Sequence, residues 1–108
     1  FTVIKALRSR YDGFKRNPWS EIEAGHHYIR AMASFGVLTA YAGYRADLVE
    51  KLLYFSPKVV DGEFKTFWIC GKAWGTFALT ENAQGKRDWS IDVLYGDLDG
   101  IDIVVAGA

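Results

Sequence analysis

The chain of 108 residues lacks the features that mark several classes of protein. It has a single cysteine, Cys70, so it can form neither an internal disulfide nor a cysteine-rich zinc site. It has no excess charge, because 13 basic residues balance 13 acidic ones, whereas nucleic-acid binders usually show a basic excess. Its longest uncharged run, residues 31–44, is shorter than the roughly 20 residues of a membrane span. These absences argue against a nucleic-acid partner and against a membrane span.

What the chain does have is apolar and aromatic residues, which make up 50% and 16% of the total. That content is too high for intrinsic disorder, and the length fits one domain over residues 1–108. The domain divides by pattern into a turn-rich entry with a long helix, residues 1–47, and a β-rich half, residues 48–108. The first residue is Phe rather than Met, which indicates a fragment of a larger protein, or a trimmed or processed chain.

A long buried helix is predicted for the first half. Ser20 and Glu23 have the spacing of a capping box, and Gly43 is a natural residue to follow the end of a helix. Between these positions, apolar residues point in nearly every direction, which is typical of a central helix. Such a helix needs neighbours on several sides. We therefore expect it to pack against the rest of a larger protein, or to form a homo-oligomer through residues 31–41.

Strands are predicted for the second half. Gly71 and Lys72 form a plausible two-residue hairpin turn between two apolar runs. In residues 89–95, large apolar side chains occupy every second position, which predicts that they share one face of a sheet. They are Trp89, Ile91, Val93 and Tyr95. The expected fold class is therefore α+β, with one long buried helix packed on a small antiparallel β-sheet.

A dense pattern precedes the predicted helix and runs into it. It reads basic-Tyr-Asp-Gly, Arg-Asn-Pro-aromatic, Glu-x-Glu-x-Gly and His-Tyr-x-Arg. In this chain these are Arg10-Tyr11-Asp12-Gly13, Arg16-Asn17-Pro18-Trp19, Glu21-Ile22-Glu23-Ala24-Gly25 and His27-Tyr28-Ile29-Arg30. The block from Tyr11 to Ser34 resembles the catalytic region of glycoside hydrolase family 116, which includes non-lysosomal glucosylceramidase and bacterial β-glucosidases. Fainter agreement continues at Phe55-Ser56-Pro57, Ala73-Trp74-Gly75 and Leu94-Tyr95-Gly96.

The resemblance implies the C-terminal piece of an (α/α)6-barrel glycosidase. The nucleophilic Glu and the Asp acid/base of such an enzyme lie upstream, so no catalytic residue is expected in this chain. Glu21 and Arg30 correspond to the residues that bind the glucose ring. The residues expected at the substrate are Glu21, Arg30, Trp19 and His27, with Glu23, Asn17 and His26 in support. Ala24 stands where the family commonly has Cys, at a position expected to serve packing.

The residues themselves fit a binding role better than a catalytic one. Glu21 and Glu23 diverge by roughly 200° if both are helical, so they do not make the close carboxyl pair of a retaining glycosidase. A carboxylate and a guanidinium are suited to hold sugar hydroxyls through charge-assisted hydrogen bonds. However, a regular helix places Glu21 and Arg30 half a turn apart. They converge only if Glu21 lies in an entry loop, which conflicts with a helix start at Ser20.

Structural interpretations of these residues stay open. Glu21 also suits the first turn of a helix, and Glu23 suits a cap or a partner of His27 or Arg30. His26 and His27 are adjacent and lack a third ligand at a suitable spacing, so no metal and no other cofactor is expected. Trp19 is expected to stack on a sugar. Elsewhere the expectations are structural: core positions for Trp68, Trp74, Trp89 and Cys70, and solvent-facing positions for Asp97, Asp99 and Asp102.

The expected function is the C-terminal segment of a glycoside hydrolase that acts on β-glucosides or glucosylceramide-like substrates. Its ligand is a β-glucoside, and the chain is expected to be inactive alone. The alternative is a free-standing carbohydrate-binding or structural and oligomerisation domain without catalytic activity. No Ser-His-Asp set, phosphate loop or CxxC motif indicates another enzyme.

Overall fold

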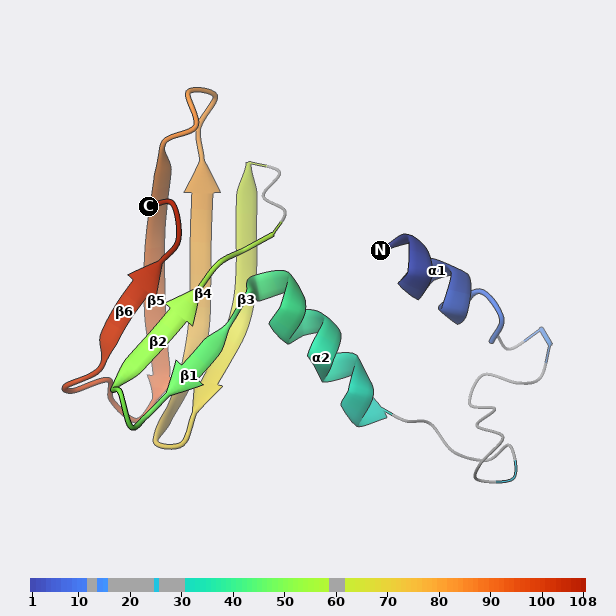
Figure 1. Ribbon diagram of the computed structural model, residues 1–108, viewed down its shortest axis with the longest axis horizontal. Helices are drawn as coiled ribbons and strands as arrows, with labels where there is room; N and C mark the ends of the chain where they lie inside the picture. The colour runs from blue at the N-terminus through green and yellow to red at the C-terminus, as the bar shows by residue number, and fades with distance from the viewer. Residues whose placement is uncertain (12–13, 16–24, 26–30, 59–61) are drawn as a thin grey trace. The chain divides into compact units, whose positions relative to one another are not determined.

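The structure, a computed structural model, describes residues 1–11, 14–15, 25, 31–58 and 62–108. The contacts divide the chain into two compact units, Phe1–Ser34 and Phe35–Ala108. In the first unit, helix α1 (Thr2–Arg8) has no buried residue. The second unit contains the core and is built from strands (Figure 1).

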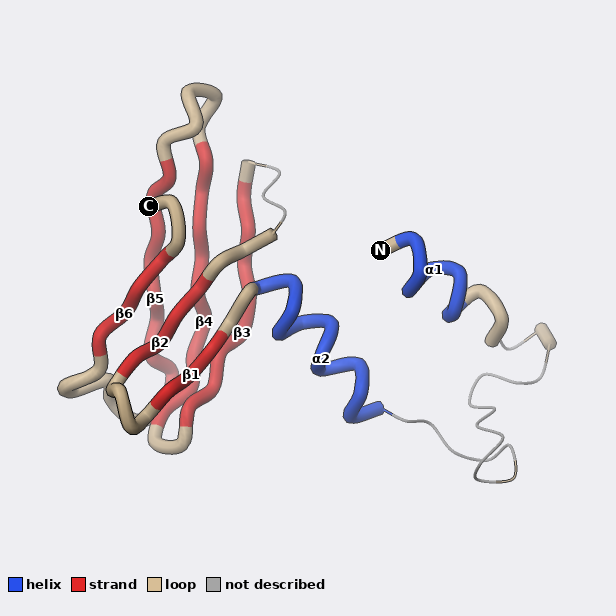
Figure 2. The backbone as a smooth tube through the Cα atoms, in the orientation of Figure 1, coloured by secondary structure: helices blue, strands red, loops and turns tan. Residues whose placement is uncertain are grey.

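Two three-stranded sheets make up most of the second unit, and in Figure 1 one lies in front of the other. The first has the order β1-β2-β6, with β1 antiparallel and β6 parallel to β2. The second has the order β3-β4-β5 and is antiparallel throughout (Figure 2). The strands are β1 (Arg45–Asp47), β2 (Leu52–Phe55), β3 (Glu63–Cys70), β4 (Ala73–Glu81), β5 (Arg87–Tyr95) and β6 (Asp102–Val105). The predicted turn at Gly71-Lys72 is confirmed, because β3 ends and β4 begins on either side of it.

The core lies between the two sheets. Strands β3 and β4 alternate buried and exposed residues, so each has an inner face toward β1-β2-β6 and an outer face. The rings of Phe55 on β2 and Phe77 on β4 stack with centroids 4.1 Å apart and planes within 6°. Trp68, Leu79 and the predicted Cys70 are buried on the same side. Because the β1-β2-β6 sheet covers this apolar face, no helix is needed to cover it.

Helix α2 (Ala31–Ala42) ends where the sequence predicts. The Tyr44 N–H donates to the Thr39 carbonyl at 3.1 Å, and the Gly43 N–H donates to the Ala40 carbonyl at 3.3 Å. Gly43 has φ +56°, and a Cβ at this position would lie 2.2 Å from the Ser56 carbonyl oxygen. This pair of bonds is the Schellman arrangement, which requires the left-handed backbone that glycine provides.

The expected α+β fold, with a long buried helix on a sheet, is wrong. Over residues 34–42 of α2 only Ala42 is buried, and Phe35 is 64% exposed. Gly25 has φ +66°, which no regular right-handed helix contains, so the helix expected from Ser20 to Gly43 is interrupted there. The described part of the chain is mostly β, with only two short helices. The apolar residues on all sides of α2 predict that this helix is buried. The two sheets instead bury each other's inner faces and leave most of α2 exposed.

The four side chains expected on one face of residues 89–95 are divided by a β-bulge. Val93 lies opposite Gly75, whereas Tyr95 lies opposite Trp74, so β5 has one extra residue at this step. Trp89 and Ile91 share the inner face with Val93, as predicted. Tyr95 is moved to the outer face, because a bulge reverses the alternation that follows it. The prediction is therefore right for three residues and wrong for Tyr95.

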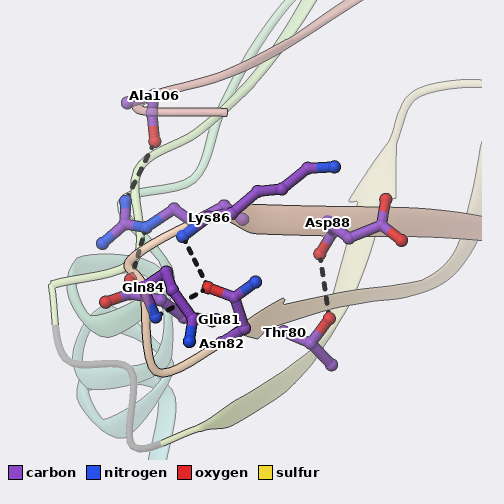
Figure 3. Close-up of polar contacts among 8 residues, drawn as sticks. Thr80, Glu81, Asn82, Gln84, Lys86, Asp88 and Ala106 are labelled. Atoms are coloured by element: carbon purple, nitrogen blue, oxygen red, sulfur yellow. Dashed lines mark hydrogen bonds and ion pairs between the residues drawn. The ribbon is translucent and has the colours of Figure 1, made fainter.

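Figure 3 shows polar contacts at one end of the second unit, among Glu81, Asn82 and Lys86 of the β4-β5 hairpin and Ala106 beyond β6. Arg87 joins the two sheets there. Its Nε lies 2.6 Å from Glu81 Oε2, and its Nη1 donates to the Ala106 carbonyl, beyond β6, at 3.1 Å. The hairpin between β4 and β5 is closed by Asn82, whose side-chain oxygen accepts the Lys86 N–H at 2.9 Å. The position of β6 relative to the β4-β5 hairpin is thus fixed by side chains as well as by the core.

Candidate functional site

The sequence-predicted site lies outside the described residues. This holds for all seven of its members: Glu21, Arg30, Trp19, His27, Glu23, Asn17 and His26. Within residues 16–30 the structure describes Gly25, which is in the left-handed region. Glu21 and Arg30 would lie half a turn apart in one regular helix, but the left-handed backbone at Gly25 excludes a regular helix through that residue. Convergence of Glu21 and Arg30 therefore stays a prediction.

Among the described residues, the outer face of β3-β4-β5 has the most distinctive set of exposed side chains. Phe67, Trp74 and Tyr95 come one from each strand and are 41%, 39% and 66% exposed. The Phe67 and Trp74 ring centroids lie 6.2 Å apart, and those of Trp74 and Tyr95 lie 6.4 Å apart with planes within 17°. The three rings form a row across the sheet, and Ile69 lies opposite Trp74 in the strand register.

Polar residues continue this face beyond the aromatic row. Thr76 on β4 lies opposite both Phe67 and Asp92, and its hydroxyl lies 3.3 Å from Asp92 Oδ2. The strand register places the remaining polar residues of the face further along it, and they are Glu63, Lys65, Thr80, Asp88 and Ser90. The outer face is therefore aromatic at one end and hydrogen-bonding at the other. It carries three carboxylates, on Glu63, Asp88 and Asp92, and one ammonium group, on Lys65.

An ion pair between Lys72 and Asp97 lies at the aromatic end of the face. Lys72 Nζ lies 2.9 Å from Asp97 Oδ1 and donates to the Asp99 carbonyl at 3.1 Å. The hydrogen bond between the Lys72 and Asp97 side chains raises the pKa of Lys72 and lowers the pKa of Asp97. Gly96, at φ +77°, approaches so closely that a Cβ would lie 2.1 Å from the Lys72 carbonyl oxygen. The turn after β3 and the segment after β5 are thus held together, next to Trp74 and Tyr95.

Tyr44 supports the edge strand of this sheet. Its hydroxyl donates to the Ile69 carbonyl at 2.7 Å, and its ring lies against Phe55 with centroids 5.1 Å apart. Burial, with a smaller contribution from the nearby Cys70, raises the pKa of Tyr44 from 10.0 to about 12. The neutral phenol is therefore the form that the folded chain favours.

This pKa shift predicts a loss of stability in alkali. The folded-state pKa exceeds the unfolded value, so the contribution of Tyr44 is intact below pH 10 and falls as the pH rises through about 12. We expect wild type to be more stable than Tyr44→Phe at pH 8 by about 1 kcal/mol, through the hydrogen bond to Ile69. The difference should shrink between pH 10 and 12, measured by urea unfolding at each pH. An unchanged difference at pH 12 would contradict the assignment.

The outer face combines aromatic rings with carboxylates and hydroxyls. Among the described residues, no three His, Cys, Asp or Glu side chains are grouped as metal ligands. Cys70, the single thiol, is buried on the opposite face of the sheet. What the face offers is ring surface for stacking, together with carboxylates and hydroxyls for hydrogen bonds. The solvent-facing positions predicted for Asp97, Asp99 and Asp102 are confirmed.

The outer aromatic row was missed from the sequence. Three tryptophans were assigned to the core, but only Trp68 is fully buried; Trp89 lies on the inner face with 38% exposed, and Trp74 points outward. The turn between β3 and β4 determines which face of the sheet each tryptophan occupies. A two-residue turn at 71–72 pairs Ile69 with Trp74 and Trp68 with Gly75, which puts the two tryptophans on opposite faces.

Comparison of the chain with known protein families, with curated proteins and with solved structures finds no significant match. Within the part of the chain that the structure describes, neither helix has the length and hydropathy to cross a membrane.

Proposed function

We propose that the chain is the C-terminal segment of a glycoside hydrolase that acts on β-glucosides or glucosylceramide-like substrates. In this proposal the segment contributes sugar-binding residues, while the nucleophile and the acid/base are supplied from outside it. The observation that carries the proposal is the block from Tyr11 to Ser34, where many residues agree with family 116 at fixed spacing. Isolated matches at the strands carry much less weight.

In the proposed site, Glu21 and Arg30 bind the hydroxyls of the glucose ring. An ionised carboxylate and a guanidinium make stronger hydrogen bonds to hydroxyls than neutral groups do. Holding the ring in place lowers the barrier at the reacting carbon, because the substrate enters the reaction already oriented. Trp19 packs on the sugar, and His27 orients its neighbours in the binding site. Glu23, Asn17 and His26 support these residues.

Helix α2 provides the contact with the rest of the catalytic domain. It has no charged residue, and its exposed side chains include Phe35, Val37 and Leu38. Protein interfaces are depleted of charge at their centres, so this surface suits a protein neighbour. A second copy of the chain is the alternative neighbour, and it corresponds to the alternative function of an oligomerisation domain. Sedimentation of the chain distinguishes the two, since only the alternative gives a concentration-dependent dimer.

The proposed site makes a direct kinetic prediction. In the complete enzyme, Arg30→Ala should lower kcat/KM for a β-glucoside roughly 30- to 1000-fold. This corresponds to a loss of about 2 to 4 kcal/mol of transition-state stabilisation. Arg30→Lys should restore only part of the loss, because an ammonium cannot make the bidentate contact. Glu21→Gln should keep the shape of the site and lose the charge-assisted bond. These values follow from steady-state kinetics on a chromogenic β-glucoside.

The control is Arg45→Ala, which removes an exposed arginine from β1. Its kcat/KM should match that of the parent enzyme. The assignment of the site is wrong if Arg30→Ala and Glu21→Gln both hydrolyse the β-glucoside at the parent rate. Thermal unfolding of every variant separates a loss of binding from a loss of folding.

A further inference from the structure

We propose that the outer face of β3-β4-β5 is a binding surface for a neutral oligosaccharide, separate from the site at Glu21 and Arg30. Phe67, Trp74 and Tyr95 stack against the sugar rings. Asp92, which Thr76 contacts at 3.3 Å, accepts hydrogen bonds from the sugar hydroxyls. This proposal does not depend on the hydrolase assignment, because it uses other residues and a different chemistry.

The three rings are not needed for the core. The inner face of the same sheet buries Phe64, Trp68, Phe77 and Leu79, and that face is covered by the other sheet. Phe67, Trp74 and Tyr95 instead leave between 39% and 66% of their surface exposed. A contiguous aromatic surface on the outside of a sheet is a mark of a binding site, because isolated apolar residues are ordinary there but a row is not.

The charges on this face decide between classes of stacking ligand. Single-stranded nucleic acid also stacks on aromatic rings, but it needs a positively charged groove along its phosphates. The outer face instead carries Glu63, Asp88 and Asp92 against Lys65 alone. That excess of carboxylates repels phosphate, whereas it supplies acceptors for hydroxyl groups. An uncharged polyhydroxylated ligand is the one that matches both the rings and the carboxylates.

The same comparison argues against a protein partner on this face. Glu, Asp, Lys and Ser are depleted at the centres of protein interfaces, yet they occupy the rest of this face beyond the aromatic row. The uncharged surface of α2 has the opposite composition and suits a protein neighbour. The sheet and the helix therefore have surfaces suited to different kinds of partner.

The geometry favours an extended chain of sugars over a compact one. The rings come from three neighbouring strands, which lie about 4.8 Å apart in a sheet, so the row runs across the strands. The observed centroid separations are 6.2 and 6.4 Å. The Trp74 and Tyr95 planes lie within 17° of each other, whereas the Phe67 ring is tilted by 43° from that of Trp74. A β-1,4-linked glucan is a flat ribbon that can place successive rings along such a row, with Trp74 and Tyr95 as its flat part, whereas an α-1,4-linked glucan curves away from it.

The test is titration of the 108-residue chain with cellohexaose, followed by isothermal calorimetry and by tryptophan fluorescence. We expect saturable binding that Trp74→Ala weakens by at least about tenfold, through the loss of a stacking ring. Tyr95→Phe keeps the ring and should bind like wild type, whereas Tyr95→Ala should bind weakly. Asp92→Asn should weaken binding without changing the fold. The matched control is Phe35→Ala, which removes an exposed ring from α2 and should leave the affinity unchanged.

Four results would overturn the proposal. The first is that cellohexaose does not bind at millimolar concentration. The second is equal affinity in wild type and Trp74→Ala with both folded by circular dichroism, and the third is stronger binding of oligothymidylate than of cellohexaose. The fourth is a dimer in sedimentation that Trp74→Ala converts to a monomer, since the face would then be an interface between copies. Failure here leaves the kinetic prediction for Arg30→Ala untouched, so the two proposals fail separately.

Discussion

Replacing Phe77 with alanine is expected to lower the free energy of unfolding of the two packed sheets by about 3 to 5 kcal/mol, a large part of their stability. Phe77 is completely buried on β4, and its ring stacks on Phe55 of the opposite sheet at 4.1 Å. It also lies within 6.5 Å of the rings of Phe64 and Trp89. Removing a buried Phe ring costs about 3 to 5 kcal/mol, because the lost transfer energy is joined by a cavity. A domain of this size is stable by only about 5 to 15 kcal/mol.

The measurement is the free energy of unfolding from urea titration, followed by circular dichroism. Phe35→Ala is the control, since it removes the same ring from an exposed position on α2 and should change the free energy by about 0.5 kcal/mol or less. A loss smaller than about 1 kcal/mol for Phe77→Ala would mean that the two sheets do not share one core. Phe77→Leu should recover part of the loss, because it refills part of the volume.

The strands were predictable because their physical signal is local. Two apolar runs on either side of a two-residue turn at Gly71-Lys72 predict β3, β4 and their antiparallel pairing. Within β3, the buried Trp68 and Cys70 alternate with the exposed Phe67 and Ile69, as the pleat of a strand requires. These features depend on neighbours along the chain, which the sequence contains.

The element that covers the inner face of β3-β4-β5 was not predictable in the same way. Four residues, Leu52–Phe55, form β2, and β6 returns from far along the chain to pair with it in parallel. No local pattern indicates that these short segments meet and cover the inner face of β3-β4-β5. The apolar stretch of α2 was the stronger local signal, and it was therefore assigned to the core in their place. The left-handed backbone at Gly25 has an equally weak signal, because glycine is also found within helices.

The candidate site on the outer face depends on a single inserted residue. Strict alternation puts Tyr95 on the inner face with Val93, and the bulge opposite Trp74 and Gly75 moves it outward. Without the bulge, Trp74 would have no aromatic neighbour on β5. The extra residue cannot be recognised from residues 89–95 alone, because it is defined by the pairing with β4. The small residue on the partner strand, Gly75, is the sequence feature that permits it.

Substituting Gly75 with alanine should therefore destabilise the chain and disrupt the outer face together. A Cβ at this position would lie 1.8 Å from the Asp92 carbonyl oxygen and 2.9 Å from the Trp68 ring. Neither neighbour can move freely, since one is strand backbone and the other is a buried indole. The strands β4 and β5 must separate at the bulge, at a cost of about 3 kcal/mol or more. Separation also moves Tyr95 away from Trp74.

Gly36→Ala provides the matched control, because this glycine lies within α2 and a Cβ there meets nothing within 4 Å. Alanine is the better helix former, so this variant should gain about 0.5 to 1 kcal/mol. Urea unfolding measures both variants, and amide hydrogen exchange locates the loss in Gly75→Ala. Protection should fall first at the β4-β5 pairs next to the bulge and last at the β2-β6 pairs. If Gly75→Ala were as stable as wild type, with its exchange pattern unchanged, β5 would not approach β4 as described, and Tyr95 would have no reason to lie on the outer face.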